Sequence, residues 1–188
     1  MCVYCGSSGA VDARYRDAAI RLGTTLAEQR VTLVYGGGRV GLMGLLADAC
    51  LQAGGTVVGV IPEFLRRAEV GHGAVTELVI VDTMHERKRA MFERSDGFVI
   101  LPGGLGTLEE TFEILTWKQL QLHDKPIVVV DVASYWEPLA ALIDHVIGEN
   151  FARPQMRELM TVVDDVDDVL PALAHAAAPR VGPEPELI

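Results

Sequence analysis

Short, fully apolar runs alternate with amphipathic segments along almost the whole chain. Residues 98–101 and residues 127–130 contain no polar side chain, which is typical of parallel strands covered on both faces. The segments between such runs repeat apolar residues every three to four positions, which predicts helices. Because strands that alternate with helices form βαβ units, the pattern predicts an α/β fold with a doubly wound parallel sheet.

The same pattern sets the expected elements and the domain organisation. We expect strands at residues 3–5, 31–35, 56–61, 77–81, 97–101, 126–131 and 161–163, and helices at residues 15–30, 42–53, 84–95, 107–122, 136–149 and 166–176. No internal repeat or linker interrupts them, and 188 residues suit a single domain, which we place at residues 1–176. Residues 177–188 are rich in proline and are expected to form a disordered tail.

Composition and charge narrow the classes of function. Apolar residues make up 49% of the chain and charged residues 22%, which excludes a wholly disordered chain. The net charge of −10, without a basic stripe, argues against a nucleic-acid partner. No apolar run approaches the roughly 18 residues of a membrane span, and no signal peptide is visible. We therefore expect a cytoplasmic protein, and a small anionic ligand is compatible with it because helix N-termini bind anions locally.

The three cysteines are Cys2, Cys5 and Cys50. The Cys2-x-x-Cys5 spacing invites a redox or metal interpretation, but it lies on a predicted strand, where residues three apart face opposite ways. Thioredoxin-type pairs lie where a helix begins, and zinc needs further ligands nearby. We interpret these cysteines as small core residues and expect no metal site.

Three glycine-rich loops follow predicted strands, at the edge where folds of this kind bind ligands. In the first, residues 6–9, Ser8 stands among small residues that let backbone N–H groups approach an anion; an ordinary turn is the alternative. The second, residues 36–41, includes Gly37 and matches G-x-G-x-x-G, with Glu63 placed 22 residues beyond it. An NAD oxidoreductase therefore stays open, although that fingerprint normally follows the first strand, and a tight turn is also an option.

The third glycine-rich loop, residues 102–110, carries the strongest signal. Its glycines leave the start of a helix without side chains, so the backbone N–H groups and the helix dipole can face a phosphate. Thr107-x-x-Glu110 also fits a capping box, in which Glu110 would only cap the helix. The adjacent carboxylates of Glu109 and Glu110 would repel a phosphate unless one of them contacts another part of the ligand. This favours a functional role for them over a purely structural one. Thr116 lies on the same helical stripe as Glu109.

A further helix carries two cations on a face flanked by methionines. Met84, Arg87, Lys88 and Met91 have the spacing of one helical face, and a capping-box match at residues 83–86 fixes the start of the helix. Cations on an inward face need an acidic partner or an anionic ligand. For Lys88, snorkelling to solvent is the alternative.

Taken together, these motifs resemble the LOG (LONELY GUY) family of cytokinin riboside 5′-monophosphate phosphoribohydrolases, many of which have carried the label of lysine decarboxylases. The resemblance rests on M-x-x-R-K-x-x-M at residues 84–91 and P-G-G-x-G-T-x-x-E at residues 102–110, and it spans roughly residues 2–169. It implies a Rossmann-like homodimer without a cofactor. The implied reaction hydrolyses the N-glycosidic bond of AMP or of an N6-substituted adenosine 5′-monophosphate, releasing the free base and ribose 5-phosphate.

The resemblance also implies roles for individual residues. Arg87 and Glu110 would be the catalytic pair. The substrate contacts would be Glu69, Lys88, Gly104, Leu105, Gly106, Thr107, Leu108, Glu109 and Thr116, of which Glu69 rests on the resemblance alone. Since breaking an N-glycosidic bond builds positive charge on the ribose, we expect Glu110 to stabilise that charge or to activate water. The division of labour between Glu109 and Glu110 stays open.

Two rival functions follow from the same residues. A non-catalytic nucleotide-binding module would retain the glycine-rich loops but would not need Arg87 together with both carboxylates. A decarboxylase would normally need a lysine that forms a Schiff base with pyridoxal phosphate, and the chain offers only Lys88, Lys118 and Lys125.

Overall fold

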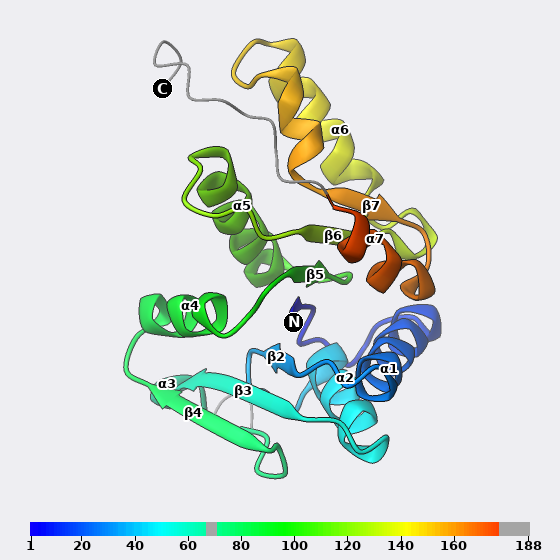
Figure 1. Cartoon of the computed structure of the whole chain (residues 1–188), viewed down its shortest axis with the longest axis vertical. Coiled ribbons are helices and arrows are strands. Elements are labelled where there is room, and N and C mark those ends of the chain that lie inside the picture. Colours follow the sequence, from blue (N-terminus) through cyan, green and yellow to red (C-terminus); the bar gives the residue numbers. More distant parts are fainter. Residues whose placement is uncertain (67–70, 177–188) are drawn as a thin grey trace.

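A seven-stranded parallel sheet forms the centre of the computed structural model, which describes residues 1–66 and 71–176. The strands are β1 (Cys2–Tyr4), β2 (Leu33–Tyr35), β3 (Val57–Pro62), β4 (Glu77–Val81), β5 (Phe98–Ile100), β6 (Ile127–Val130) and β7 (Thr161–Val163). They lie in the order β4-β3-β2-β1-β5-β6-β7 (Figure 1). The predicted doubly wound parallel sheet is confirmed.

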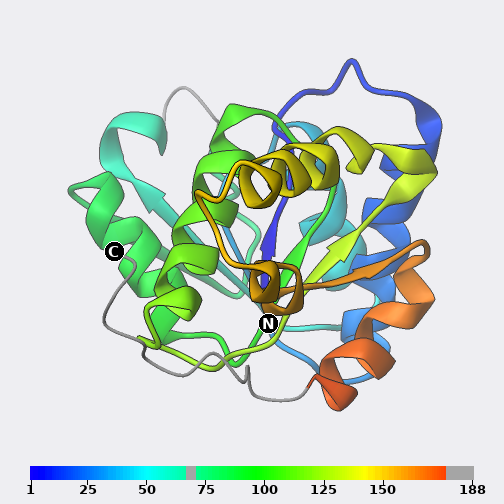
Figure 2. The same ribbon diagram turned by 90° about the horizontal axis from the view of Figure 1, so that it is seen from above.

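Helices cover both faces of the sheet, as Figures 1 and 2 show. They are α1 (Ala13–Glu28), α2 (Gly41–Gln52), α3 (Glu63–Arg66), α4 (Met84–Glu93), α5 (Leu105–Gln119), α6 (Glu137–Gly148) and α7 (Val169–His175). Buried side chains of α1, α2 and α7 form one core, and those of α4, α5 and α6 form a second core on the opposite face. Within the described residues, no helix is long and apolar enough to cross a membrane.

The sequence pattern missed a few short elements. Neither α3, with four residues, nor the 3-10 helix Pro154–Leu159 was expected, because each is too short to establish a period. The helix expected over residues 166–176 is divided into a 3-10 turn, Val166–Asp168, and α7. The tail expected at residues 177–188 lies outside the described residues.

The order of the strands reverses beside β1. Strands β1 to β4 extend the sheet in one direction, and β5 to β7 extend it in the other, so β1 pairs with both β2 and β5. The loops that follow β1 and β5 therefore begin side by side, and the Gly6 N–H donates to the Pro102 carbonyl oxygen over 3.0 Å. Sheets of this class bind their ligands at this reversal.

Helices α1 and α2 pack closely because glycine stands at their contact. A Cβ atom added to Gly23 of α1 would lie 2.3 Å from the carbonyl oxygen of Leu46 on α2. That oxygen belongs to helix backbone and has little freedom to move. The close approach of α1 and α2 therefore depends on the missing side chain.

We expect Gly23→Ala to destabilise the protein by about 2 kcal/mol, which corresponds to a fall in Tm of roughly 4–8 °C, because the methyl group overpacks the contact. Gly148→Ala, at the end of α6, is the matched control, since no atom lies within 4 Å of its added Cβ. Thermal unfolding followed by circular dichroism measures both variants. Equal Tm values for Gly23→Ala and the parent would contradict this account of the contact.

The cysteines are core residues, as expected. Cys2 packs in the core beneath α4, α5 and α6, whereas Cys5 and Cys50 pack in the core on the other face. All three are buried and free. Burial raises the pKa of the Cys2 thiol to about 12 and that of Cys50 to about 11. The native thiols are therefore protonated at neutral pH and inaccessible.

Because of this burial, we expect the native protein to resist a thiol-reactive dye at about pH 8, where a thiol with its ordinary pKa is partly ionised. Unfolding in guanidinium should release all three thiols. Mass spectrometry of the labelled protein counts the modified cysteines in each state. Rapid labelling of a native cysteine would show that the cysteines are not core residues.

Candidate active site

The loop between β5 and α5 presents an open, glycine-lined surface at the reversal of the sheet. Helix α5 begins at Leu105, and Gly104 is its N-cap residue. An added Cβ at Gly104 or Gly106 would meet no atom within 4 Å, whereas one at Gly103 would lie 2.1 Å from Thr107 Oγ1. The N–H groups of the first turn have no intrahelical acceptor, so this surface can receive an anion.

The start of α5 decides between the two interpretations of Glu110. Because the helix begins at Leu105, Thr107 lies in its first turn rather than at the N-cap. The capping-box interpretation of Thr107 and Glu110 is therefore wrong. The Thr83–Glu86 capping box at the start of α4, by contrast, is confirmed, with both of its hydrogen bonds present.

The Glu110 side chain is buried between α5 and the sheet. Only 9% of this residue is exposed. Burial is the main cause of the raised pKa of Cys2 and Tyr4, and the Glu110 charge raises both further, which places its carboxylate close to β1. Glu110 is therefore a largely desolvated carboxylate at the central strand, one turn and a half beyond the start of α5.

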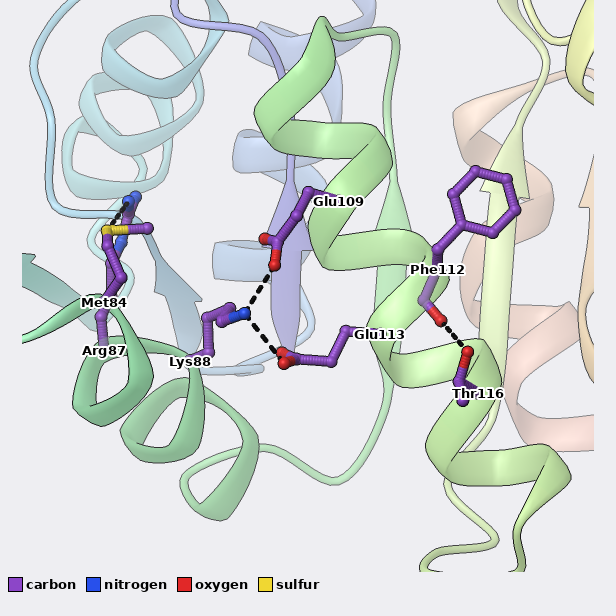
Figure 3. A network of polar contacts seen from close by, with 7 residues as sticks. All are labelled: Met84, Arg87, Lys88, Glu109, Phe112, Glu113 and Thr116. Atoms are coloured by element: carbon purple, nitrogen blue, oxygen red, sulfur yellow. Dashed lines mark hydrogen bonds and ion pairs between the residues drawn. The ribbon is translucent and has the colours of Figure 1, made fainter.

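Arg87 is a buried cation at the end of the neighbouring strand β2. It is 6% exposed, and its Nη2 donates to the Gly36 carbonyl oxygen over 3.2 Å. Its Nη1 lies 3.8 Å from the sulfur of Met84 (Figure 3), and its Nε has no partner in the described part of the chain. An added Cβ on Gly36 would lie 2.1 Å from Nη2, so glycine makes room for the guanidinium.

Lys88 ties α4 to α5 through two carboxylates, as Figure 3 shows. Its Nζ donates to Glu109 Oε1 over 2.6 Å and to Glu113 Oε1 over 2.8 Å. Burial alone would lower the pKa of Lys88, but the hydrogen bonds to the two glutamates outweigh it, so the pKa is raised. The snorkelling alternative is wrong, because Lys88 is only 8% exposed.

The structure separates Ser8 and Thr116 from this ion pair. Ser8 lines a cavity of about 280 Å³ between α1 and α2, together with Arg16, Arg39 and Asp48. Thr116 is exposed on α5, and its hydroxyl donates to the Phe112 carbonyl oxygen over 2.7 Å, apart from the Lys88 contacts (Figure 3).

The remaining candidates are distributed along the loops and α5. Gly37 lies in the turn after β2 with a φ of +76° and packs against Ile61. Leu105 is 85% exposed at the start of α5, and Leu108 is half-buried one turn later. Glu69 lies outside the described residues.

Three residues that connect neighbouring segments of this region were not predicted from the sequence. Glu113 pairs with Lys88, and its position four residues after Glu109 was an available signal. The Tyr135 hydroxyl donates to the Gly103 carbonyl oxygen over 2.7 Å from the loop after β6. His72 is 1% exposed and contacts Asp48. Nothing in the local sequence distinguishes Tyr135 or His72.

Comparison with known sequences finds one matching family and several similar enzymes. Residues 43–173 match the family described as "possible lysine decarboxylase". The cytokinin riboside 5′-monophosphate phosphoribohydrolase of Rhodococcoides fascians is 45% identical over 172 residues, which cover 91% of this chain and 87% of that protein. The corresponding enzyme LOG1 of Arabidopsis thaliana is 43% identical over 173 residues, which cover 92% and 81%.

Solved structures share the fold at low sequence identity. The molybdenum cofactor carrier protein of Chlamydomonas reinhardtii has a TM-score of 0.70 and 22% identity, with 93% of this chain and 95% of that chain covered. The molybdenum cofactor binding protein of Rippkaea orientalis has a TM-score of 0.68 and 19% identity, with 90% and 92% covered. These likenesses establish a Rossmann-like fold.

The contacts of Lys88 predict that Glu113 contributes more to the free energy of unfolding than the exposed, paired Glu93 does. We expect Glu113→Gln to cost about 1–2 kcal/mol, because it removes a charged hydrogen-bond acceptor from a buried ammonium group. Glu93→Gln is the matched control, since its partner Arg89 has a side chain that is 77% exposed, and surface pairs contribute little. Urea unfolding measures both. A loss for Glu113→Gln no larger than that for Glu93→Gln would contradict the assignment.

Proposed function

We propose that this chain, which belongs to the LOG family of cytokinin riboside 5′-monophosphate phosphoribohydrolases, hydrolyses the N-glycosidic bond of AMP or of N6-substituted adenosine 5′-monophosphates. The products are the free base and ribose 5-phosphate. One observation carries the proposal for the site. A buried carboxylate, Glu110, and a buried guanidinium, Arg87, lie over the neighbouring strands β1 and β2, beside the open glycine-rich start of α5.

The phosphate binds at the start of α5. Residues 104–107 offer backbone N–H groups at the positive end of a 15-residue helix, with open space above Gly104 and Gly106. This local positive end allows an anion to bind despite the net charge of −10. Lys88 lies close by and neutralises Glu109, so a phosphate does not meet an isolated carboxylate there.

The bond breaks beside Glu110. As the C1′–N9 bond lengthens, positive charge develops on the ribose, and the Glu110 carboxylate stabilises it in a largely desolvated environment. The same carboxylate takes a proton from the attacking water, whose oxygen joins C1′. The bonding electrons leave with N9 of the base, which gains a proton from solvent water, and Glu110 releases the proton it took to solvent, so the net change is the addition of one water. Glu109, held by Lys88, binds the ribose hydroxyls, and Arg87 orients the nucleotide and stabilises the departing base.

The positions of the lysines disfavour the decarboxylase function that the family description suggests. The chain has three lysines. Lys88 donates to two glutamates, Lys118 donates to the Lys125 carbonyl oxygen, and Lys125 donates to the Phe92 carbonyl oxygen. A Schiff-base lysine needs an amine that a cofactor aldehyde can reach, and each of these amines is engaged in a structural contact.

We also propose that the chain forms a homodimer, acts in the cytoplasm and binds AMP, as the family resemblance implies. Size-exclusion chromatography with light scattering tests the dimer. Incubation with AMP and with N6-isopentenyl-AMP, followed by chromatography of adenine and N6-isopentenyladenine, tests the reaction. Binding of both nucleotides without release of either base would favour the non-catalytic nucleotide-binding module.

We expect Glu110→Gln to lower kcat for base release by at least about 100-fold, because the amide can neither stabilise positive charge nor accept the proton. AMP binding, measured by isothermal titration calorimetry, should persist. Glu137→Gln, on an exposed position of α6, is the control and should retain full activity. Full activity in Glu110→Gln would remove Glu110 from the mechanism.

A further inference from the structure

We propose that His72 is a positioning residue for this reaction, because it locks the turn that holds the Arg87 guanidinium. The inference rests on the proposed function and adds a residue to it that does not touch the substrate. His72 lies after β3, on a segment that crosses the turn between β2 and α2.

The His72 ring is fixed in one orientation. It is 1% exposed, and its Nδ1 accepts a hydrogen bond from the Ala74 N–H over 3.4 Å. The proton of the neutral ring therefore lies on Nε2, which is 3.0 Å from Asp48 Oδ1 and donates to it. Asp48 belongs to α2, so the ring joins its own segment to the helix that follows the glycine-rich turn.

The backbone beside the ring holds the turn itself. The His72 N–H donates to the Gly37 carbonyl oxygen over 3.0 Å, and Gly71 forms an antiparallel bridge with Gly38. On its other side the turn packs against β3, since an added Cβ on Gly37 would lie 3.0 Å from Ile61 Cβ. The turn is thus clamped between β3 and the segment that carries His72.

The clamped turn supplies the oxygen acceptor of Arg87. Nη2 of Arg87 donates to the carbonyl oxygen of Gly36, the residue immediately before Gly37. His72 and Asp48 therefore act on Arg87 through the backbone of residues 36–38. If the ring is lost, the turn gains freedom and the guanidinium loses its fixed acceptor. Displacements of about 1 Å in a positioning group are enough to cost up to a hundredfold in rate.

Four variants separate positioning from stability. His72→Ala removes the donor to Asp48, whereas His72→Gln offers an amide N–H in place of Nε2. Asp48→Ala removes the acceptor, and Asp48→Asn retains an oxygen acceptor. His145→Gln, on α6, is the matched control. Base release from AMP is measured for each variant at a temperature below its Tm, together with its unfolding curve.

We expect His72→Ala and Asp48→Ala to lower kcat by about 10-fold or more with a smaller change in KM. His72→Gln and Asp48→Asn should recover most of that loss, and His145→Gln should match the parent. A lowered Tm with unchanged kcat in the folded alanine variants would overturn the proposal. So would failure of both conservative variants to restore kcat while they restore Tm.

A spectroscopic signal keeps this inference separate from the reaction. The Arg87 Nε–H resonance, assigned with an Arg87→Lys variant, should shift or broaden in His72→Ala and return in His72→Gln, whether or not the parent releases base. An unchanged resonance in folded His72→Ala would overturn the clamp. Absence of base release by the parent would instead overturn the proposed function and leave the clamp to be decided by this resonance.

Discussion

The close approach of three backbone loops beside β1 is the constraint on which the site depends. The Gly6 N–H donates to the Pro102 carbonyl oxygen, and the Leu42 N–H donates to the Gly6 carbonyl oxygen, both over 3.0 Å. A Cβ on Gly41 would lie 2.3 Å from the backbone of Ser7. Side chains would force these loops apart, so glycine allows the loops at the reversal of strand order to lie together at one edge of the sheet.

Charge within this edge is arranged locally rather than spread over the surface. The chain is acidic overall, yet Arg87 and Lys88 are both buried on α4. They are held differently: Lys88 is neutralised by two carboxylates, whereas Arg87 rests on a carbonyl oxygen and a sulfur. Lys88 therefore fixes α4 against α5 and restrains Glu109, while Arg87 is the cation that we propose for contact with the nucleotide.

The local sequence predicted most of the fold, because apolar runs and helical periods indicated the parallel sheet. The glycine-rich loops after strands predicted the edge of the sheet at which we propose that the ligand binds. The exact start of α5 was missed, so the role of Thr107 as a cap was wrong. The contacts of His72 with Asp48 and of Tyr135 with Gly103 join segments 24 and 32 residues apart. Hydrophobic periodicity carries no information on such pairs, because they form only when the tertiary fold brings the segments together.

A crystal structure of the Glu110→Gln variant with AMP would show where the nucleotide lies relative to α5, Glu110 and Arg87. We expect the phosphate to lie against the backbone N–H groups of residues 104–107, at the start of α5. We also expect the glycosidic bond to lie beside residue 110 and the Arg87 guanidinium to contact the nucleotide. AMP bound elsewhere, for example in the cavity lined by Arg16 and Arg39 between α1 and α2, would contradict this expectation.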